Sequence, residues 1–371
     1  MKITKLTVYC VVLDKWGVET RYTKTLNMEI PLETTVLRID TDEGLTGWGE
    51  TMTAPSYYLP TSPQSARAGI ELIAPALLGQ DPLNHRARME DIRFAMRGHK
   101  PTKSVIDMAL WDLQGKARGL PLVHLWGGRV VEDMPVLCLV NTASPEEQVA
   151  QIEEFRAQGY KLFQIKIGHG SPQLEVARIR ACQQAMREDE RCWFDVNRAW
   201  TVDQAMQVMP LVRDLAPLIE QPCETYEQCR TVARHTGMGL MLDEAIEDQD
   251  SFIRAAEDGV INVAVLKMGC TGGISEHRHL VETGLRLDIP MRIEDFYGTG
   301  LTLAAVSHLA QGLPAAATFG LYDYHLPAVP VVKNPFPVVN GRVKVPEDCA
   351  PGLGVEVDPE VLGDPVAEYR L

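Results

Sequence analysis

The chain has 371 residues, with 36 Lys or Arg against 50 Asp or Glu, and its formal net charge is −14. A hydrophobic content of 45% with 23% charged residues is typical of globular proteins and excludes a disordered or collagen-like chain. The negative balance argues against binding to nucleic acid or to an anionic membrane, since such partners are held by clusters of Lys and Arg. A small anionic substrate is not excluded, because a local cation can hold it.

The N-terminus predicts a strand and not a targeting segment. The apolar run from residue 6 to residue 13 ends at Asp14, and no small-residue cleavage site follows it. No stretch approaches the roughly 18 apolar residues of a membrane-spanning helix. The eight cysteines include no Cys-x-x-Cys pair and are expected to be reduced, which predicts a cytoplasmic protein.

Residues 1–130 are expected to form an N-terminal α+β capping domain. Apolar and polar residues alternate over residues 34–50 on either side of Asp42-Glu43-Gly44, which predicts a β-hairpin. Three helical stretches are expected to follow, near residues 64–78, 83–96 and 103–118.

A regular alternation of strands and helices is expected over residues 131–345. Eight short apolar runs rich in β-forming residues predict strands at residues 135–140, 162–167, 192–196, 217–220, 239–243, 261–267, 289–294 and 316–320. Capping-box sequences begin several of the helices between them, as at Ser144 with Glu147. Strands that alternate with helices pair in parallel, and eight of them close a barrel. The chain is therefore predicted to be an α/β protein with a (β/α)₈-type barrel, whose C-terminal segment, residues 346–371, returns to the capping domain.

Polar side chains recur at the ends of the predicted strands, where barrels of this type carry their chemistry. The second to seventh strands end, in order, at Lys166; Asp195 and Asn197; Glu220; Asp243 and Glu244; Lys267; and Glu294 and Asp295. One charged group per βα unit, always at the end of the strand, is difficult to produce by chance.

Three of these acids are expected to lie together, because Asp195, Glu220 and Asp243 follow neighbouring strands. Close carboxylates raise one another's pKa values unless a cation lies between them. Oxygen ligands without His or Cys nearby suit Mg²⁺. The alternative is that each acid only caps the following helix. Capping explains any single one of these acids better than it explains all three together.

Lys166 and Lys267 end the second and sixth strands, which are opposite each other in a ring of eight. Each lysine is expected to reach one face of a carbon atom held between them. A lysine pKa is ordinarily about 10.4, and neighbouring cations with partial burial would lower it. Ion pairs with the acids are the structural alternative. The combined pattern predicts removal of a proton from the carbon next to a carboxylate, with Mg²⁺ stabilising the enediolate.

These residues lie in motifs that resemble the enolase superfamily, specifically its muconate-lactonizing and mandelate-racemase-like members. The motifs run through nearly the whole chain: DEGLTGWGE (42–50), KSVIDMALWDLQGK (103–116), LWGG (125–128), DVNRAWT (195–201), IEQPC (219–223), LDE (242–244) and LK with GG (266–267, 272–273). The resemblance implies a modified TIM barrel of the (β/α)₇β type with an N-terminal α+β capping domain, assembled as a homo-oligomer. It also implies that Mg²⁺ is bound by Asp195, Glu220 and Asp243, with Lys166 and Lys267 as the acid–base pair.

One position departs from this family pattern. Many relatives carry Lys-x-Lys on the second strand, whereas this chain has Gln164-Ile165-Lys166. The first lysine, which helps to lower the pKa of the second, is thus a neutral glutamine. Lys166 is expected to depend more on Mg²⁺ and Lys267 for its activation. Polar groups behind the proposed ligands are expected at Gln164, Asn197, Glu244 and Glu294, with a structural ion pair as the alternative for Glu294.

Within the superfamily, the chain resembles a branch that acts on proline-like amino acids. The similar segments are PSYYLP (55–60), residues 66–83, RGH (97–99) and IEDFYG (293–298). That branch includes cis-3-hydroxy-L-proline dehydratases and epimerases of proline or hydroxyproline betaines. The resemblance places Tyr57, Asp295, Phe296 and Tyr322 in the substrate pocket, with plain loop packing as the alternative for each. An acid with aromatic rings suits a cationic amine.

The leading hypothesis is a racemase or epimerase of a proline-like amino acid or betaine, in which one lysine removes the α-proton and the other returns a proton to the opposite face. The close alternative is a cis-3-hydroxy-L-proline dehydratase, and a muconate-type cycloisomerase is the third. A Schiff-base aldolase would need one lysine as nucleophile and no group of carboxylates. A non-catalytic binding protein would need neither the two lysines nor the carboxylates.

Overall fold

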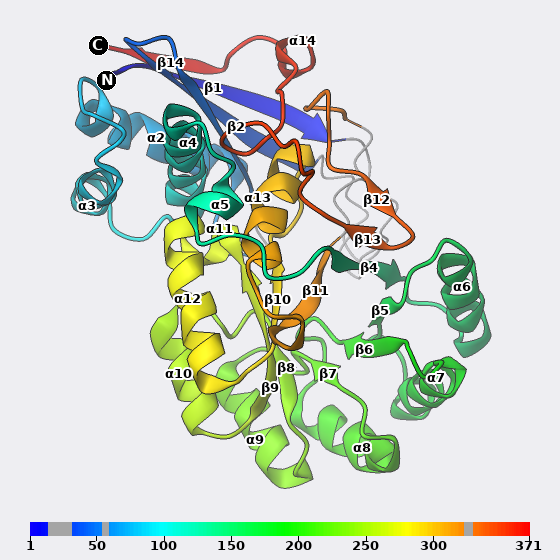
Figure 1. The fold of residues 1–371 in the computed structure, drawn as a ribbon. Helices are drawn as coiled ribbons and strands as arrows, with labels where there is room; N and C mark the ends of the chain where they lie inside the picture. The colour runs from blue at the N-terminus through cyan, green and yellow to red at the C-terminus, as the bar shows by residue number, and fades with distance from the viewer. Residues whose placement is uncertain (14–31, 54–58, 323–328) are drawn as a thin grey trace.

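The computed structural model describes residues 1–13, 32–53, 59–322 and 329–371. An antiparallel sheet with its helices lies at one end of the molecule, and a closed barrel of parallel strands forms the rest (Figure 1). Among the described residues, no helix is both long and apolar enough to cross a membrane.

The antiparallel sheet has the strand order β14-β1-β2-β3. Its strands are β1 (Ile3–Leu13), β2 (Leu32–Thr41), β3 (Thr46–Met52) and β14 (Ala367–Arg370). The predicted hairpin is present as β2 and β3, paired from Thr34 with Met52 to Asp40 with Thr46. Because β14 pairs with β1, the two ends of the chain lie side by side in this sheet (Figure 1).

The three predicted helices cover one face of this sheet. They are α2 (Pro63–Leu77), α3 (His85–Ala95) and α4 (Lys100–Arg118), and the short α5 (Leu122–Leu125) follows them. The backbone of α4 lies so close to β3 that a Cβ atom at Gly49 would be 2.0 Å from the carbonyl oxygen of Val105. Only glycine fits at this contact, which explains one of the glycines in the hairpin motif.

Eight parallel strands form the barrel, with ends that agree with the predicted ranges to within two residues. They are β4 (Met134–Val140), β5 (Leu162–Lys166), β6 (Arg191–Asp195), β7 (Ile219–Glu220), β8 (Leu240–Leu242), β9 (Ile261–Lys267), β10 (Met291–Glu294) and β11 (Thr318–Tyr322). Pairing of β11 with β4, as between Leu321 and Val136, closes the ring. The predicted α/β barrel fold is therefore confirmed.

Helices surround the barrel. Several of them begin with capping boxes, including the predicted one of Ser144 with Glu147, and those of Thr201 with Gln204 and Thr225 with Gln228. The longer helices are α6 (Pro145–Ala157), α7 (Pro172–Ala185), α8 (Val202–Val212), α9 (Tyr226–Thr236), α10 (Gln249–Glu257), α12 (Ile274–Leu287) and α13 (Gly300–Gln311). Shorter elements are η1 (Arg213–Leu215), α11 (Met268–Thr271), η2 (Ala315–Ala317), β12 (Val338–Val339), β13 (Arg342–Val343) and α14 (Pro359–Leu362). The described residues between β11 and β12 hold no helix, as in a (β/α)₇β barrel.

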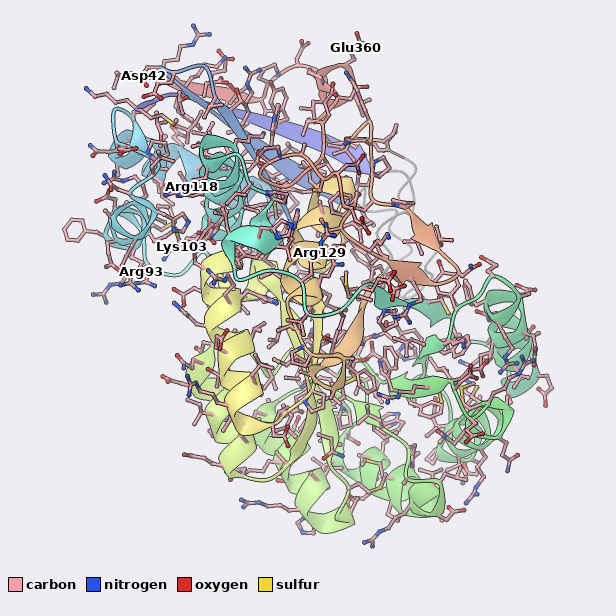
Figure 2. The ribbon with its side chains drawn as sticks, in the orientation of Figure 1. Asp42, Arg93, Lys103, Arg118, Arg129 and Glu360 are labelled. Atoms are coloured by element: carbon pink, nitrogen blue, oxygen red, sulfur yellow. The ribbon has the colours of Figure 1, made fainter. Side chains whose placement is uncertain are left out.

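Charged side chains join the capping sheet and its helices to the barrel. Glu50 on β3 is fully buried, and its Oε2 atom accepts hydrogen bonds from the backbone N–H and hydroxyl groups of Thr299 and Thr302 at the start of α13. A carboxylate at a helix N-terminus stabilises the helix. At the other edge of the junction, Arg93 of α3 pairs with Glu276 of α12, and Figure 2 shows Arg93 and Lys103 on this side of the molecule.

Candidate active site

The side chains of the site come from alternate positions on the barrel strands. Residues two apart on a strand point to the same face, so Lys166 shares its face of β5 with Gln164, and Glu294 shares its face of β10 with Arg292. Strand register places Lys166 beside Asp195, and Asp195 beside Glu220. Lys267 and Glu294 are paired in the same way on β9 and β10. The predicted strand-end residues are thus neighbours.

Asp195 is a buried carboxylate with donors on both of its oxygens. Lys166 Nζ and Gln164 Nε2 donate to its Oδ2 atom, the latter at 2.9 Å, and the backbone N–H of Asn197 donates to Oδ1 at 2.8 Å. Burial and the nearby negative charge of Glu220 raise the pKa of Asp195 to about 6, although Lys166 opposes this shift. Asp195 is therefore a carboxylate that gains from a further cation.

Glu220 has more hydrogen-bond donors than Asp195. Arg292 donates to both of its oxygens, at 2.7 Å to Oε1 and 3.0 Å to Oε2. Trp193 Nε1 and Gln164 Nε2 also donate to Oε2, at 2.7 and 3.0 Å. Burial by itself would raise the pKa of Glu220, but Arg292, with smaller contributions from Lys166 and Lys267, outweighs burial, and the pKa lies below its usual value.

Asp243 follows β8 directly and forms an ion pair with Lys267. Glu294 Oε1 lies 3.7 Å from the same ammonium group, and Arg292 Nε lies 2.7 Å from Glu294 Oε2. Burial alone would lower the pKa of Lys267, but Asp243 and Glu294 hold it well above its ordinary value. The lowering expected from the sequence depends on a neighbouring cation, which would have to offset the charges of these two carboxylates.

Lys166 lies on the opposite side of the ring in a more open environment. Its side chain is 21% exposed, against 9% for Lys267. Besides Asp195, it donates to Asn197 Oδ1 at 2.8 Å. Asn197 itself has a positive φ of 46°, which asparagine tolerates better than most residues.

The contacts join these groups into one continuous network. In order along it are Lys166, Asp195, Gln164, Glu220, Arg292, Glu294, Lys267 and Asp243. Both predicted lysines and all three predicted metal-binding acids are included. The network therefore places one ammonium group at each end of a series of carboxylate oxygens.

The other predicted residues occupy several places around this network. Phe296 lies over Lys267, with the ring centroid 4.8 Å from Nζ. Asp295 is buried, and its Oδ1 atom accepts hydrogen bonds from the backbone N–H groups of Gly269 and Phe296. Tyr322, at the end of β11, packs against Tyr297 with ring centroids 6.1 Å apart.

Glu244 is a further predicted residue, and its negative charge also acts on Lys267. Glu244 pairs with Arg198 at 3.6 Å. Tyr57 lies outside the described residues.

Arg292 is a member of the network that was not predicted from the sequence. Its side chain is only 1% exposed, inside the barrel and against the ring of Trp193. A signal was present, because a charged residue interrupts the apolar strand two residues before Glu294 and therefore on the same face.

Comparison with known proteins identifies the family. Residues 147–361 match the model described as enolase C-terminal domain-like, and residues 26–127 match that of the mandelate racemase / muconate lactonizing enzyme N-terminal domain. The chain belongs to the enolase superfamily. It is thus an enolase-superfamily enzyme, as its sequence motifs predict.

Relatives in the superfamily differ in their reactions. The chain is 35% identical over 371 residues to a cis-3-hydroxy-L-proline dehydratase of Roseibium aggregatum, with all of both chains covered. It is 28% identical over 363 residues to a muconate cycloisomerase 1 of Acinetobacter baylyi, covering 94% of each chain. A crystal structure of an enolase-superfamily member from Roseovarius nubinhibens ISM, complexed with magnesium, superimposes with a TM-score of 0.93 at 36% identity and full coverage of both chains.

Proposed function

We propose that this enzyme uses Mg²⁺ and two lysines to remove the proton next to the carboxylate of a proline-like amino acid. The observation that carries the proposal is the continuous network, in which Lys166 and Lys267 border the same group of carboxylates from opposite strands of the ring.

The described residues contain no group of three acids already gathered as a metal site, but the chemistry of the carboxylates at these strand ends suits a magnesium ion. Asp195, Glu220 and Asp243 would hold it, since all three offer carboxylate oxygens at the ends of neighbouring strands. The pKa of Asp195, raised by burial and by Glu220, is the signature of acids that lack sufficient positive charge. When bound, the ion would stabilise the negative charge that develops on the substrate carboxylate during proton removal.

The lysines would transfer the protons. Because Asp243 holds the pKa of Lys267 high, this lysine can act as a base only when another cation engages that carboxylate. Lys166 is also ion-paired, in its case with Asp195. Proton transfer by a positioned lysine would then occur on either face of the substrate.

The substrate class rests on the neighbouring residues and on the dehydratase relative. Asp295 would pair with a ring ammonium group, and Phe296 and Tyr322 would pack around it. The 35% identity over the whole chain favours cis-3-hydroxy-L-proline and its dehydration. In that reaction one lysine takes the proton from C2, the hydroxyl group leaves C3 as water with a proton from the other, and the resulting enamine tautomerises to a cyclic imine.

Epimerisation is a second candidate, and the placement of the lysines favours it. β5 and β9 are four strands apart in the ring, so Lys166 and Lys267 can address opposite faces of one carbon atom. If no leaving group is present at C3, proton return from the opposite side inverts C2.

Proton NMR in D₂O tests both reactions. We expect Mg²⁺-dependent loss of the C2 proton signal with cis-3-hydroxy-L-proline, followed by loss of the C3 hydroxymethine signal if the enzyme dehydrates it. L-Proline, hydroxyproline betaines and cis,cis-muconate in the same panel separate epimerisation and cycloisomerisation. Absence of C2 proton exchange with every proline derivative would overturn the proposal.

A further inference from the structure

The proposed reaction assigns no role to Arg292, which is a buried cation. Arg292 lies inside the barrel on β10, and its side chain is only 1% exposed. It donates to both oxygens of Glu220, at 2.7 and 3.0 Å, and its Nε lies 2.7 Å from Glu294. A charge is buried at this depth only with its partners in place, so Arg292, Glu220 and Glu294 form one electrostatic unit.

The residue that faces Arg292 across Glu220 is neutral. Gln164 Nε2 lies 3.0 Å from Glu220 Oε2 and 2.9 Å from Asp195 Oδ2. A cation at position 164 would therefore contact two of the three proposed metal ligands. In this chain the positive charge on Glu220 comes from the other side, from β10.

The charges of the network determine what it can bind. Within the described residues, the network joins four carboxylates to three cations, the lysines 166 and 267 and Arg292, which leaves one excess negative charge. A divalent cation turns this into one excess positive charge, which suits an anionic carboxylate substrate. Without Arg292, the loaded site would have no excess positive charge.

The donors also restrict how Glu220 can bind a metal ion. Its Oε2 atom accepts three hydrogen bonds, from Arg292, Gln164 and Trp193, whereas Oε1 accepts one, from Arg292. A carboxylate oxygen with three donors has no lone pair left for a ligand bond. Glu220 is thus held with Oε1 as the oxygen able to ligate.

We propose that Arg292 is a positioning residue that sets the charge of the cation site. It holds Glu220 and Glu294, and it supplies from β10 the positive charge that Gln164 does not supply from β5. This inference rests on the proposed function, because it assumes that Glu220 binds Mg²⁺ and that the substrate is an anion.

Five chains test it: the wild type, Arg292→Gln, Arg292→Lys, Gln164→Lys and the double variant Gln164→Lys with Arg292→Gln. Calorimetry on the metal-free proteins gives the Kd for Mg²⁺, and steady-state kinetics give KM. For Arg292→Gln we expect Mg²⁺ to bind about tenfold more tightly or better, and KM for the carboxylate substrate to rise by a similar factor. Gln164→Lys should weaken Mg²⁺ binding by about tenfold, because it adds a cation. Arg292→Lys and the double variant should remain within about threefold of the wild type.

Several results would overturn the inference. Unchanged or weaker Mg²⁺ binding in folded Arg292→Gln would show that its charge does not set the site, as would a double variant no closer to the wild type than Arg292→Gln. If Arg292→Gln does not fold, Gln164→Lys decides, and an unchanged Kd there rejects the inference. A wild type that neither binds Mg²⁺ nor exchanges C2 protons would instead reject the proposed function, and this inference with it.

Discussion

The two lysines on opposite strands of the barrel have different surroundings. Lys166 is 21% exposed and contacts Asp195 and the amide oxygen of Asn197. Lys267 is 9% exposed, lies beneath the ring of Phe296 and contacts two carboxylates, Asp243 and Glu294. One lysine therefore has a polar, partly exposed environment, and the other has an enclosed environment with an aromatic ring.

This difference has a consequence for the chemistry. A symmetrical pair would suit the removal and return of the same kind of proton, as in epimerisation. An unsymmetrical pair suits two different tasks, such as taking a proton from carbon and giving one to a departing hydroxyl group. The unequal environments therefore favour the proposed dehydration, the reaction named for one relative, over epimerisation.

The largest effects are expected from removing either lysine. Lys166→Ala and Lys267→Ala should each lower kcat by about 10²- to 10⁴-fold, the usual contribution of a positioned acid or base. If the two have different tasks, C2 proton exchange with cis-3-hydroxy-L-proline should survive in one variant and not in the other. Lys161→Ala, at an exposed ion pair with Asp189, is the matched control. Exchange retained equally in both variants would contradict the division of tasks.

Asp243→Asn tests the carboxylate that holds Lys267. We expect it to weaken Mg²⁺ binding and to lower activity by about 10²-fold or more, because a ligand charge is lost. The variant should still fold, although its thermal unfolding midpoint should fall because Lys267 loses a buried partner. Normal Mg²⁺ affinity in an inactive, folded variant would show that Asp243 acts in another way. Exposed Asp189→Asn serves as the control.

Phe296→Leu removes the ring over Lys267 while keeping an apolar side chain. A cation–π contact contributes about 0.5–2 kcal/mol, so kcat should change by about 2- to 30-fold. The exposed Phe94, changed to Leu, should have no effect. An unchanged kcat in Phe296→Leu would show that the ring does not contribute to the difference between the two lysines.

The smallest effect is a dependence on pH through Asp295, on the same side as Lys267. Burial raises its pKa to about 7, although the N–H groups of Phe296 and Gly269 oppose the shift. If its ionised form pairs with an ammonium substrate as proposed, KM should fall a few-fold as the pH rises through about 7. Asp295→Asn should abolish this step in KM, and a step of unchanged size in the variant would assign it to another group.

The same group makes a prediction for stability. Because the folded-state pKa exceeds the unfolded value near 3.8, the folded chain binds more protons between the two. The free energy of unfolding contributed by Asp295 should thus be greatest below about pH 4 and be lost as the pH rises to about 7. Urea unfolding of the wild type and Asp295→Asn at several pH values measures it.

Much of the site could be predicted because strand periodicity and strand ends are local properties. Lys166, Asp195, Glu220 and Lys267 each end an apolar run, and each lies at or beside the end of its strand in the structure. The fold followed from the same alternation. The partners of these residues could not be predicted, since Gln164 bridges two carboxylates on different strands only because of the register between β5, β6 and β7.

Two buried charges illustrate this limit. Glu50 is a hairpin residue in the sequence, yet it accepts a hydrogen bond from Thr299 at the start of α13, and the two residues are 249 positions apart in the chain. Arg292 is one charge within an apolar strand, yet it contacts Glu220 from three strands away in the ring. Nothing local to either residue indicates its partner.

The sequence by itself determined an acidic, globular α/β chain with a barrel, a group of carboxylates and two lysines at strand ends. These features depend on composition and on periods of 2 and 3.6 residues, which each segment carries on its own. Only the tertiary structure decided that the two lysines have unequal surroundings and that the buried cation on Glu220 is Arg292. Burial and ion pairing depend on which segments meet across the closed ring, and closure is a property of all eight strands together.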